Sequence, residues 1–325
     1  MSMTSEPSAS VTDPSASTPG SSGPYPAPSF IDPTTLMQIK SLELRARAVV
    51  EGLFSGLHRS PYHGFSVEFT EYRQYVDGDD LRYLDWRLFA RSDRYYIKRF
   101  EDETNLRCHV LLDNSRSMSY GSLPYSKADY GKTLAGTLAY FLNSQRDAIG
   151  LLRFSETVDE FIPPRYRPGH LRRVLLSLEH QPEGTSTGIL PALEQVAERV
   201  KRRALFLLVT DLLTPLEELE SRLGYLRSGG SDVSIFQILD PAELDFPFEE
   251  ATLFVDAETG KELYVDPAVA RQSYQQKMQQ HLKEIDEMSG RMGIHLTRLT
   301  TDTPLERALL DFLKIRKQLP TIQRR

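Results

Sequence analysis

From residue 105 onward the chain alternates between short apolar runs and longer segments in which apolar residues recur every three to four positions. The apolar runs have the length and composition of buried strands and cover residues 108–112, 148–154, 204–210, 233–239 and 294–299. The periodic segments have the spacing of one helix face and cover residues 126–143, 189–200, 216–226 and 267–289. Because strands alternate with helices, the pattern predicts an α/β fold with a doubly wound, mostly parallel sheet covered by helices on both faces.

The residues before 105 follow a different pattern. A tail over residues 1–31 is rich in Ser, Pro and Thr and lacks an apolar core, so we expect it to be disordered. Asp32 and Pro33 have the order of a helix N-cap and a first helical residue. Apolar residues spaced along 36–53 then predict one amphipathic helix.

Two β segments are predicted outside the regular alternation. Residues 64–103 are dense in aromatic residues and in charges of both signs, and the alternation over 95–100 predicts a strand. Residues 252–256 and 261–265 predict a hairpin inserted into the α/β domain. The predicted parts of the chain are a disordered tail (1–31), an N-terminal segment that packs on the core (32–104), the α/β domain (105–318) and a C-terminal tail (319–325).

Composition and charge exclude several classes of protein. With 40% hydrophobic and 26% charged residues, the chain is typical of globular proteins. The formal net charge of -6 argues against a nucleic-acid partner, since phosphate binding needs clustered Lys and Arg. No stretch approaches the roughly 18 uninterrupted apolar residues of a membrane helix, so we expect a cytoplasmic protein without membrane insertion. Cys108 is the only cysteine, and its apolar surroundings predict a buried, inert thiol.

Polar side chains follow two of the predicted strands and precede one of the predicted helices. Asp113, Ser115 and Ser117 come after the first apolar run at alternate positions. Asp211 follows the third run, and Thr185 lies in a Gly-Thr-Ser-Thr-Gly loop ahead of the helix before it. Since ligands of open α/β sheets bind at the carboxyl ends of strands, we expect these side chains to converge. Their oxygens, without His or Cys, predict a hard-cation site for Mg²⁺, with Mn²⁺ as the alternative ion.

The same residues have a plainer interpretation, because Asp, Ser and Thr at strand-to-helix junctions are commonly N-caps and turn formers. The order of three separate pieces favours the metal site over capping alone. Asp113 and Asp211 supply the two formal negative charges that offset one divalent ion. A coordination position left over would attract a carboxylate from elsewhere.

Asp-x-Ser-x-Ser after a buried strand, a Gly-Thr-x-Thr loop and Thr-Asp after a second buried strand resemble the metal-ion-dependent adhesion site of von Willebrand factor A domains. The resemblance implies that Ser115, Ser117 and Thr185 are direct metal ligands. It also implies that Asp113 and Asp211 act directly or through water. In that family a partner's Glu or Asp supplies the last ligand, so the implied function is metal-dependent protein binding without catalysis.

The segment ahead of the α/β domain resembles the domain-of-unknown-function 58 family. The matching residues are Tyr72, Arg73, Tyr75, Gly78, Asp79, Arg82, Leu84, Asp85, Trp86, Ala90, Arg91 and the extended 96–100. Members of this bacterial family are typically encoded beside MoxR-type AAA+ ATPases and are thought to be their adaptors. Many members carry transmembrane helices ahead of this segment, and this chain resembles the soluble branch. From the residues alone, the charges and aromatics are either a structural ion-pair network or a partner-binding surface.

The sequence is therefore compatible with three functions. The leading one is a non-catalytic adaptor that binds a partner carboxylate through Mg²⁺ and works with a MoxR-type AAA+ ATPase. A Mg²⁺-dependent phosphoesterase with Asp113 as nucleophile or ligand is the enzymatic alternative, although it needs a positioned acid or base and a cation for the phosphoryl charge. A structural scaffold with an unused metal site is the third. Gly131-Lys-Thr133 imitates the end of a phosphate-binding loop but lies inside a helical pattern, so no nucleotide site is predicted.

Overall fold

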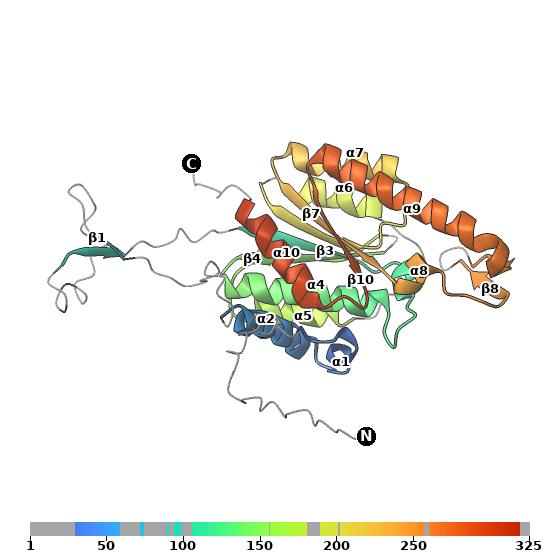
Figure 1. Ribbon diagram of the computed structural model, residues 1–325. Coiled ribbons are helices and arrows are strands. Elements are labelled where there is room, and N and C mark those ends of the chain that lie inside the picture. Colours follow the sequence, from blue (N-terminus) through green and yellow to red (C-terminus); the bar gives the residue numbers. More distant parts are fainter. Residues whose placement is uncertain are drawn as a thin grey trace, which may run out of the picture.

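The computed structural model describes residues 30–58, 72–74, 89, 91, 94–98, 106–155, 157–180, 189–200, 202–256 and 260–318. Its central sheet contains β3 (Arg107–Asp113), β4 (Ala148–Phe154), β5 (Val158–Arg165), β6 (Leu205–Thr210), β7 (Asp232–Leu239) and β10 (His295–Thr300). The strand order across the sheet is β10-β7-β6-β3-β4-β5 (Figure 1). All neighbouring strands pair in parallel except β4 and β5, which are antiparallel. The predicted mostly parallel sheet is confirmed.

The five apolar runs of the sequence all form strands, with ends within one residue of the predicted ones. β5 was not predicted. It lies at the edge of the sheet, its residues are mostly half-exposed, and it contains Pro163 and Pro164. Proline lacks the N–H group that bonds to a neighbouring strand, so within sheets it is found mainly in edge strands. The two prolines also interrupt the apolar pattern by which the other strands were predicted.

Helices cover both faces of the sheet (Figure 1). One face carries α2 (Leu42–His58), α4 (Lys127–Ser144), α5 (His170–Leu178) and α10 (Leu305–Gln318), and the other carries α6 (Ile189–Arg199), α7 (Leu216–Ser228) and α9 (Pro267–Met292). Alternation along β3 separates the two cores, because Val110 and Leu112 pack with the first set and Leu111 with the second. The doubly wound α/β fold is therefore confirmed, together with the four helices predicted between the strands.

The N-terminal helix differs from its prediction. Asp32 caps a helix as expected, accepting the backbone N–H of Thr35 at 2.8 Å, with Pro33 at the first position. That helix, α1 (Pro33–Met37), ends after five residues, and α2 starts anew at Leu42. The single helix predicted over 36–53 was wrong because Leu36 and Leu42 are both buried, so the apolar spacing continues across the break.

α2 is anchored to the α/β core. Leu42 packs closely on Gly136 of α4, where an added Cβ atom would lie 3.3 Å from the Leu42 side chain. Arg45 donates to the hydroxyl of Thr133 at 2.8 Å, and the backbone N–H of Ile31 donates to Glu306 of α10 at 2.9 Å. Of the aromatic and charged segment that follows, the structure describes an antiparallel pair, β1 (Tyr72–Gln74) and β2 (Tyr96–Lys98), which confirms the strand predicted near 95–100.

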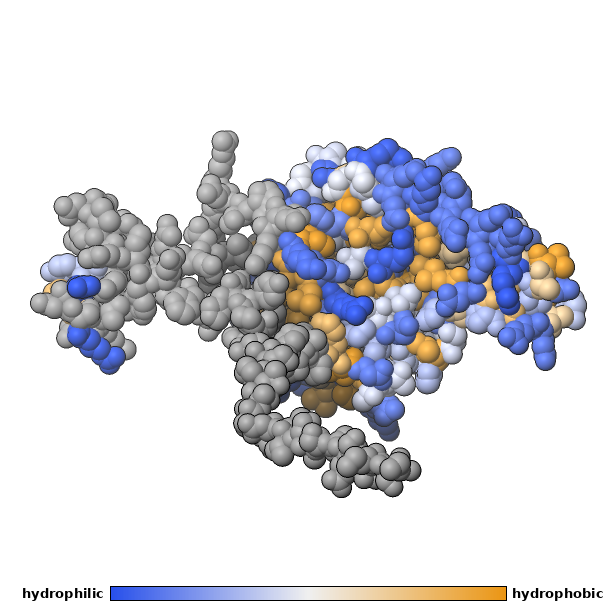
Figure 2. Space-filling model, in the orientation of Figure 1, coloured by the Kyte–Doolittle hydropathy of each residue, from blue (hydrophilic) through white to orange (hydrophobic). Residues whose placement is uncertain are grey.

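The predicted hairpin consists of β8 (Thr252–Val255) and β9 (Glu262–Val265), and it lies beside α8 (Pro241–Asp245) and the start of α9. Phe254 stacks on Phe246 and meets Phe248 edge to face. Leu263 and Tyr264 are 65% and 71% exposed, and Figure 2 shows apolar side chains at this end of the molecule. No helix in the described part of the chain combines the length and the apolar character needed to span a bilayer.

Candidate functional site

The topology brings the predicted site residues to one edge of the sheet. β3 and β6 are parallel neighbours, so Asp113 at the end of β3 and Asp211 directly after β6 lie at the same carboxyl edge. Both side chains are buried, as is Ser115, and Ser117 is half-buried. This is where ligands of open α/β sheets bind.

Asp113 is oriented by two hydrogen bonds. Its Oδ1 accepts the backbone N–H of Ser115 at 2.9 Å, and its Oδ2 accepts the hydroxyl of Thr210 at 2.6 Å. A buried carboxylate needs such donors because it has lost its hydration. In the sequence, Thr210 was noted as the end of a strand and as part of the Thr-Asp pair, without a role of its own, and the structure shows that it positions Asp113.

Ser115 and Ser117 have the spacing of two ligands of one small ion. The short 3₁₀-helix η2 (Arg116–Ser119) follows Ser115 and turns the chain so that the two hydroxyl oxygens lie 3.0 Å apart, where one hydroxyl donates a hydrogen bond to the other. Neighbouring ligands of an octahedral Mg²⁺, each about 2.1 Å from the ion, are separated by about 3.0 Å. The hydroxyl pair therefore fits the ion that the sequence predicted.

Asp211 sits at the start of a strained turn. Leu212 has a φ of 59°, a left-handed conformation that costs a branched residue free energy and is found at functional sites. Its N–H donates to the hydroxyl of Thr210, and the N–H of Leu213 donates to Oδ1 of Asp211, both at 3.2 Å. The turn thus fixes the direction of the Asp211 carboxylate.

Thr185, the remaining predicted ligand, lies outside the described residues together with its loop at 184–188. Its role stays a prediction. In the part of the chain that the structure describes, no three His, Cys, Asp or Glu side chains form a cluster that could hold a metal. A metal at this edge would therefore need the hydroxyls of Ser115 and Ser117 as well as carboxylates.

Sequence reasoning missed a buried lysine beside Asp211. Lys127, the first residue of α4, is fully buried, and its Nζ lies 2.9 Å from Asp211 Oδ2 and 2.6 Å from Glu243 Oε1. Glu243 belongs to α8, where its Oε2 accepts the backbone N–H of Asp240 at 2.8 Å. The available signal was a lysine at the start of a helix, where the helix dipole disfavours a cation.

The electrostatics of the edge are those of crowded carboxylates. Burial, and next the charge of Asp211, raise the pKa of Asp113 to about 7, against the hydrogen bonds from Thr210 and Ser115. Burial alone would lower the pKa of Lys127, but Asp211 and Glu243 outweigh it and the pKa is raised. With all four groups ionised, three carboxylates and one ammonium leave a formal charge of two minus, which one divalent cation neutralises.

Asn114 adds a second sign that this edge receives a polar group. Its side chain is buried, and neither its amide nitrogen nor its oxygen has a hydrogen-bond partner among the described residues. Buried amides are nearly always hydrogen-bonded. The orphaned amide directly after Asp113 and the buried oxygens around it fit a bound, hydrated cation.

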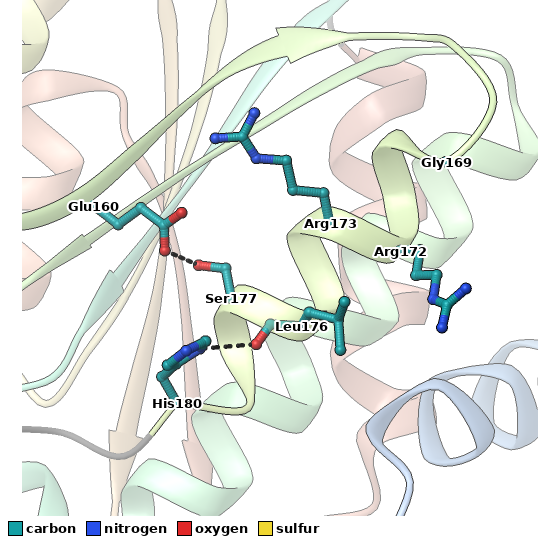
Figure 3. A pocket seen from close by; sticks show the side chains of 7 residues that line it. All are labelled: Glu160, Gly169, Arg172, Arg173, Leu176, Ser177 and His180. Atoms are coloured by element: carbon teal, nitrogen blue, oxygen red, sulfur yellow. Dashed lines mark hydrogen bonds between the residues drawn. The ribbon is translucent and has the colours of Figure 1, made fainter.

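A cavity elsewhere on the molecule does not compete with this site. It has a volume of about 340 Å³, lies between β5 and α5, and is lined by Glu160, Gly169, Arg172, Arg173, Leu176, Ser177 and His180 (Figure 3). Glu160 is held by the hydroxyl of Ser177 at 2.6 Å, and Arg172 points away from it in Figure 3. None of the four predicted metal ligands that the structure describes, Asp113, Ser115, Ser117 and Asp211, lines this cavity.

Two other features of the sequence behave as predicted. The Gly131-Lys-Thr133 stretch is in the interior of α4, so it forms no phosphate-binding loop. Cys108 is fully buried in the core, and burial raises the pKa of its thiol well above its ordinary value. The thiol is therefore structural.

Comparison with known proteins gives relatives over most of the chain. The uncharacterized protein Rv1480 of Mycobacterium tuberculosis (strain H37Rv) is 22% identical over 292 residues, which are 88% of this chain and 91% of that protein. The uncharacterized protein Mb1516 of Mycobacterium bovis has the same identity and coverage.

Among solved structures, BatB from Bacteroides thetaiotaomicron is 16% identical with a TM-score of 0.45, covering 66% of this chain and 100% of that one. The SpRpn10 VWA domain is 11% identical with a TM-score of 0.40, covering 63% of this chain and 93% of that one. The model of the family described as "Protein of unknown function DUF58" matches residues 71–284, more than half of the 325 residues. The chain therefore belongs to the DUF58 family.

Proposed function

We propose that this chain is a non-catalytic protein-interaction module that binds a Glu or Asp of its partner through Mg²⁺, with Mn²⁺ as the alternative ion. Ser115, Ser117 and Thr185 would hold the metal directly, and Asp113 and Asp211 directly or through water. The metal supplies one chemical property, a strong attraction for a carboxylate oxygen. All other specificity comes from the protein surface around it.

The observation that carries this proposal is the pair of hydroxyl oxygens of Ser115 and Ser117, 3.0 Å apart beside the oriented carboxylate of Asp113. Capping alone does not explain this arrangement. Ser115 is the N-cap of η2 but makes no side-chain capping hydrogen bond, and Asp113 is held by Thr210 from a different strand. The donor set also lacks the His and Cys ligands that softer metals prefer.

For the partner we propose a MoxR-type AAA+ ATPase. The basis is that the chain belongs to the DUF58 family. The resemblance of the sequence to this family implied an association with such ATPases. The chain would then act as an adaptor that presents a client protein to the ATPase or recognises the ATPase itself. The carboxylate that completes the metal shell would come from one of these two proteins.

Direct binding to a purified MoxR-type ATPase from the same organism tests the proposal. Binding is compared between wild type and Asp113→Ala in one Mg²⁺ buffer, because chelating Mg²⁺ would also disturb the nucleotide site of the ATPase. We expect Asp113→Ala to weaken binding by about thirtyfold or more, equivalent to roughly 2 kcal/mol for a central contact. Asp232→Ala is the matched control, since Asp232 starts β7 at the opposite edge of the sheet. Equal binding of wild type and Asp113→Ala would contradict the proposal that the ATPase supplies the carboxylate, and it would favour a carboxylate from the client or a scaffold with an unused site.

The enzymatic alternative is tested in parallel. Lys127 brings a cation to the site, but its Nζ is buried and engaged by Asp211 and Glu243 rather than open to a phosphoryl group. We expect no turnover of generic phosphoesters such as p-nitrophenyl phosphate with Mg²⁺. Turnover that Asp113→Asn abolishes would replace the interaction module with a phosphoesterase.

A further inference from the structure

Lys127 places a permanent positive charge in a site that the proposed function assigns to a second cation. Its side chain is 0% exposed, and a lysine is almost never fully buried unless it is paired. The pairing is with Asp211, one of the predicted metal ligands, and with Glu243. The ammonium group would therefore share the Asp211 carboxylate with a bound metal.

Local structure does not explain this lysine. The start of α4 is already capped by Ser126 and Asp129, whose side chains and backbone form a reciprocal capping box. A cation at the first helical position is opposed by the positive end of the helix dipole. Its position is therefore determined by contacts across the fold, from α4 to the turn after β6 and to α8.

The two partners of Lys127 differ in their relation to the metal site. Asp211 is a predicted ligand, whereas Glu243 is linked to Asp211 through Lys127 and uses its other oxygen for the backbone of Asp240. Loss of the ammonium charge would leave three carboxylates at the site. Loss of the Glu243 charge would leave the ammonium compensated by Asp211 alone.

This inference rests on the proposed function. We infer that Lys127 competes with the divalent metal for Asp211 and lowers the metal affinity of the free chain, and that Glu243 raises this affinity by neutralising Lys127. Lys127 thus limits how tightly the free chain binds its metal. Because a partner's carboxylate adds negative charge, metal and partner then strengthen each other's binding.

A purely structural role for the ion pair makes a different prediction. If Lys127 and Glu243 only clamp Asp211 in place, removing either one loosens a metal ligand and weakens metal binding. An electrostatic role gives effects of opposite sign. The sign of the change therefore separates the two roles.

The experiment is a Mn²⁺ titration of the purified full chain, followed by electron paramagnetic resonance and repeated with Mg²⁺ as competitor. The variants are Lys127→Met, which keeps the length of the side chain without its charge, Glu243→Gln, and the double variant. We expect Lys127→Met to bind Mn²⁺ about tenfold more tightly and Glu243→Gln about tenfold more weakly at 0.1 M salt. The double variant should bind more tightly than Glu243→Gln. That comparison holds even if Lys127→Met alone does not fold, which circular dichroism would show.

Weaker binding in Lys127→Met, or a double variant that binds no more tightly than Glu243→Gln, would overturn the inference while leaving the metal site in place. Mn²⁺ that stays free with wild type and with every variant would instead refute the proposed function, and the inference with it. The two failures are therefore distinguishable.

Discussion

Thr210→Val is the sharpest perturbation of the site that leaves every predicted ligand in place. Valine has nearly the shape of threonine and suits a strand. The substitution removes the hydroxyl that donates to Asp113 Oδ2 at 2.6 Å and accepts the N–H of Leu212 at 3.2 Å. The bond to Asp113 is short, buried and charge-assisted, which places it among the stronger hydrogen bonds of proteins.

The magnitude follows from that bond. Removing a hydrogen bond to a buried charged group costs roughly 1.5–3 kcal/mol, so the free energy of unfolding in EDTA should fall by about that amount. Groups that orient metal ligands change metal affinity by about 10–100-fold when they are removed. We therefore expect the Mn²⁺ affinity of Thr210→Val to fall by about tenfold or more.

The assays are urea denaturation in EDTA and a Mn²⁺ titration of the folded protein. Thr137→Val is the matched control, because the hydroxyl of Thr137 is also buried but bonds to the carbonyl of Thr133 within α4. Thr137→Val should leave the Mn²⁺ affinity unchanged. If Thr210→Val binds Mn²⁺ as tightly as wild type, Asp113 is not oriented by Thr210 for metal binding and the reasoning fails.

Three further predictions concern the core. Burial lowers the pKa of His109 from 6.5 to about 4. The contribution of neutral His109 to the free energy of unfolding is therefore complete above pH 6.5 and is lost as the pH falls toward 4, by up to about 3 kcal/mol. Urea denaturation at pH 7.5 and pH 4.5 should show this loss reduced in His109→Leu, and an equal loss in both proteins would contradict it. Gly150→Ala should destabilise by about 1–3 kcal/mol in thermal unfolding, since its Cβ would lie 2.8 Å from the backbone of Ile162 in β5. Gly290→Ala, whose Cβ meets nothing within 4 Å, should not destabilise, and equal effects would refute the packing argument. Cys108 should resist iodoacetamide until the protein unfolds, so labelling of the native protein at the rate of a free thiol would disprove its burial.

The strands of the α/β domain were predictable because a parallel sheet covered on both faces needs continuous apolar runs. β6 is an example, with every residue from Leu205 to Thr210 buried. β5 was not predicted because only one of its residues, Ile162, is fully buried and two prolines interrupt it. The break between α1 and α2 was not predicted either, because the helical spacing of apolar residues continues across it.

The residues of the site likewise fall into those that the sequence could place and those that it could not. Asp113 and Asp211 could be placed together because each ends a strand, and parallel neighbours end at one edge. Lys127 and Glu243 come from the starts of two helices, and only the packing of α4 and α8 brings them to Asp211. Pairings of that kind leave no periodic pattern in a sequence.

Metal binding by the isolated chain underlies both proposals, and electron paramagnetic resonance tests it by giving the stoichiometry of bound Mn²⁺. We expect one Mn²⁺ per wild-type chain, displaced by Mg²⁺, and loss of that site in the Ser115→Ala, Ser117→Ala double variant. Mn²⁺ bound equally by wild type and the double variant, or left free by both at millimolar concentration, would contradict it.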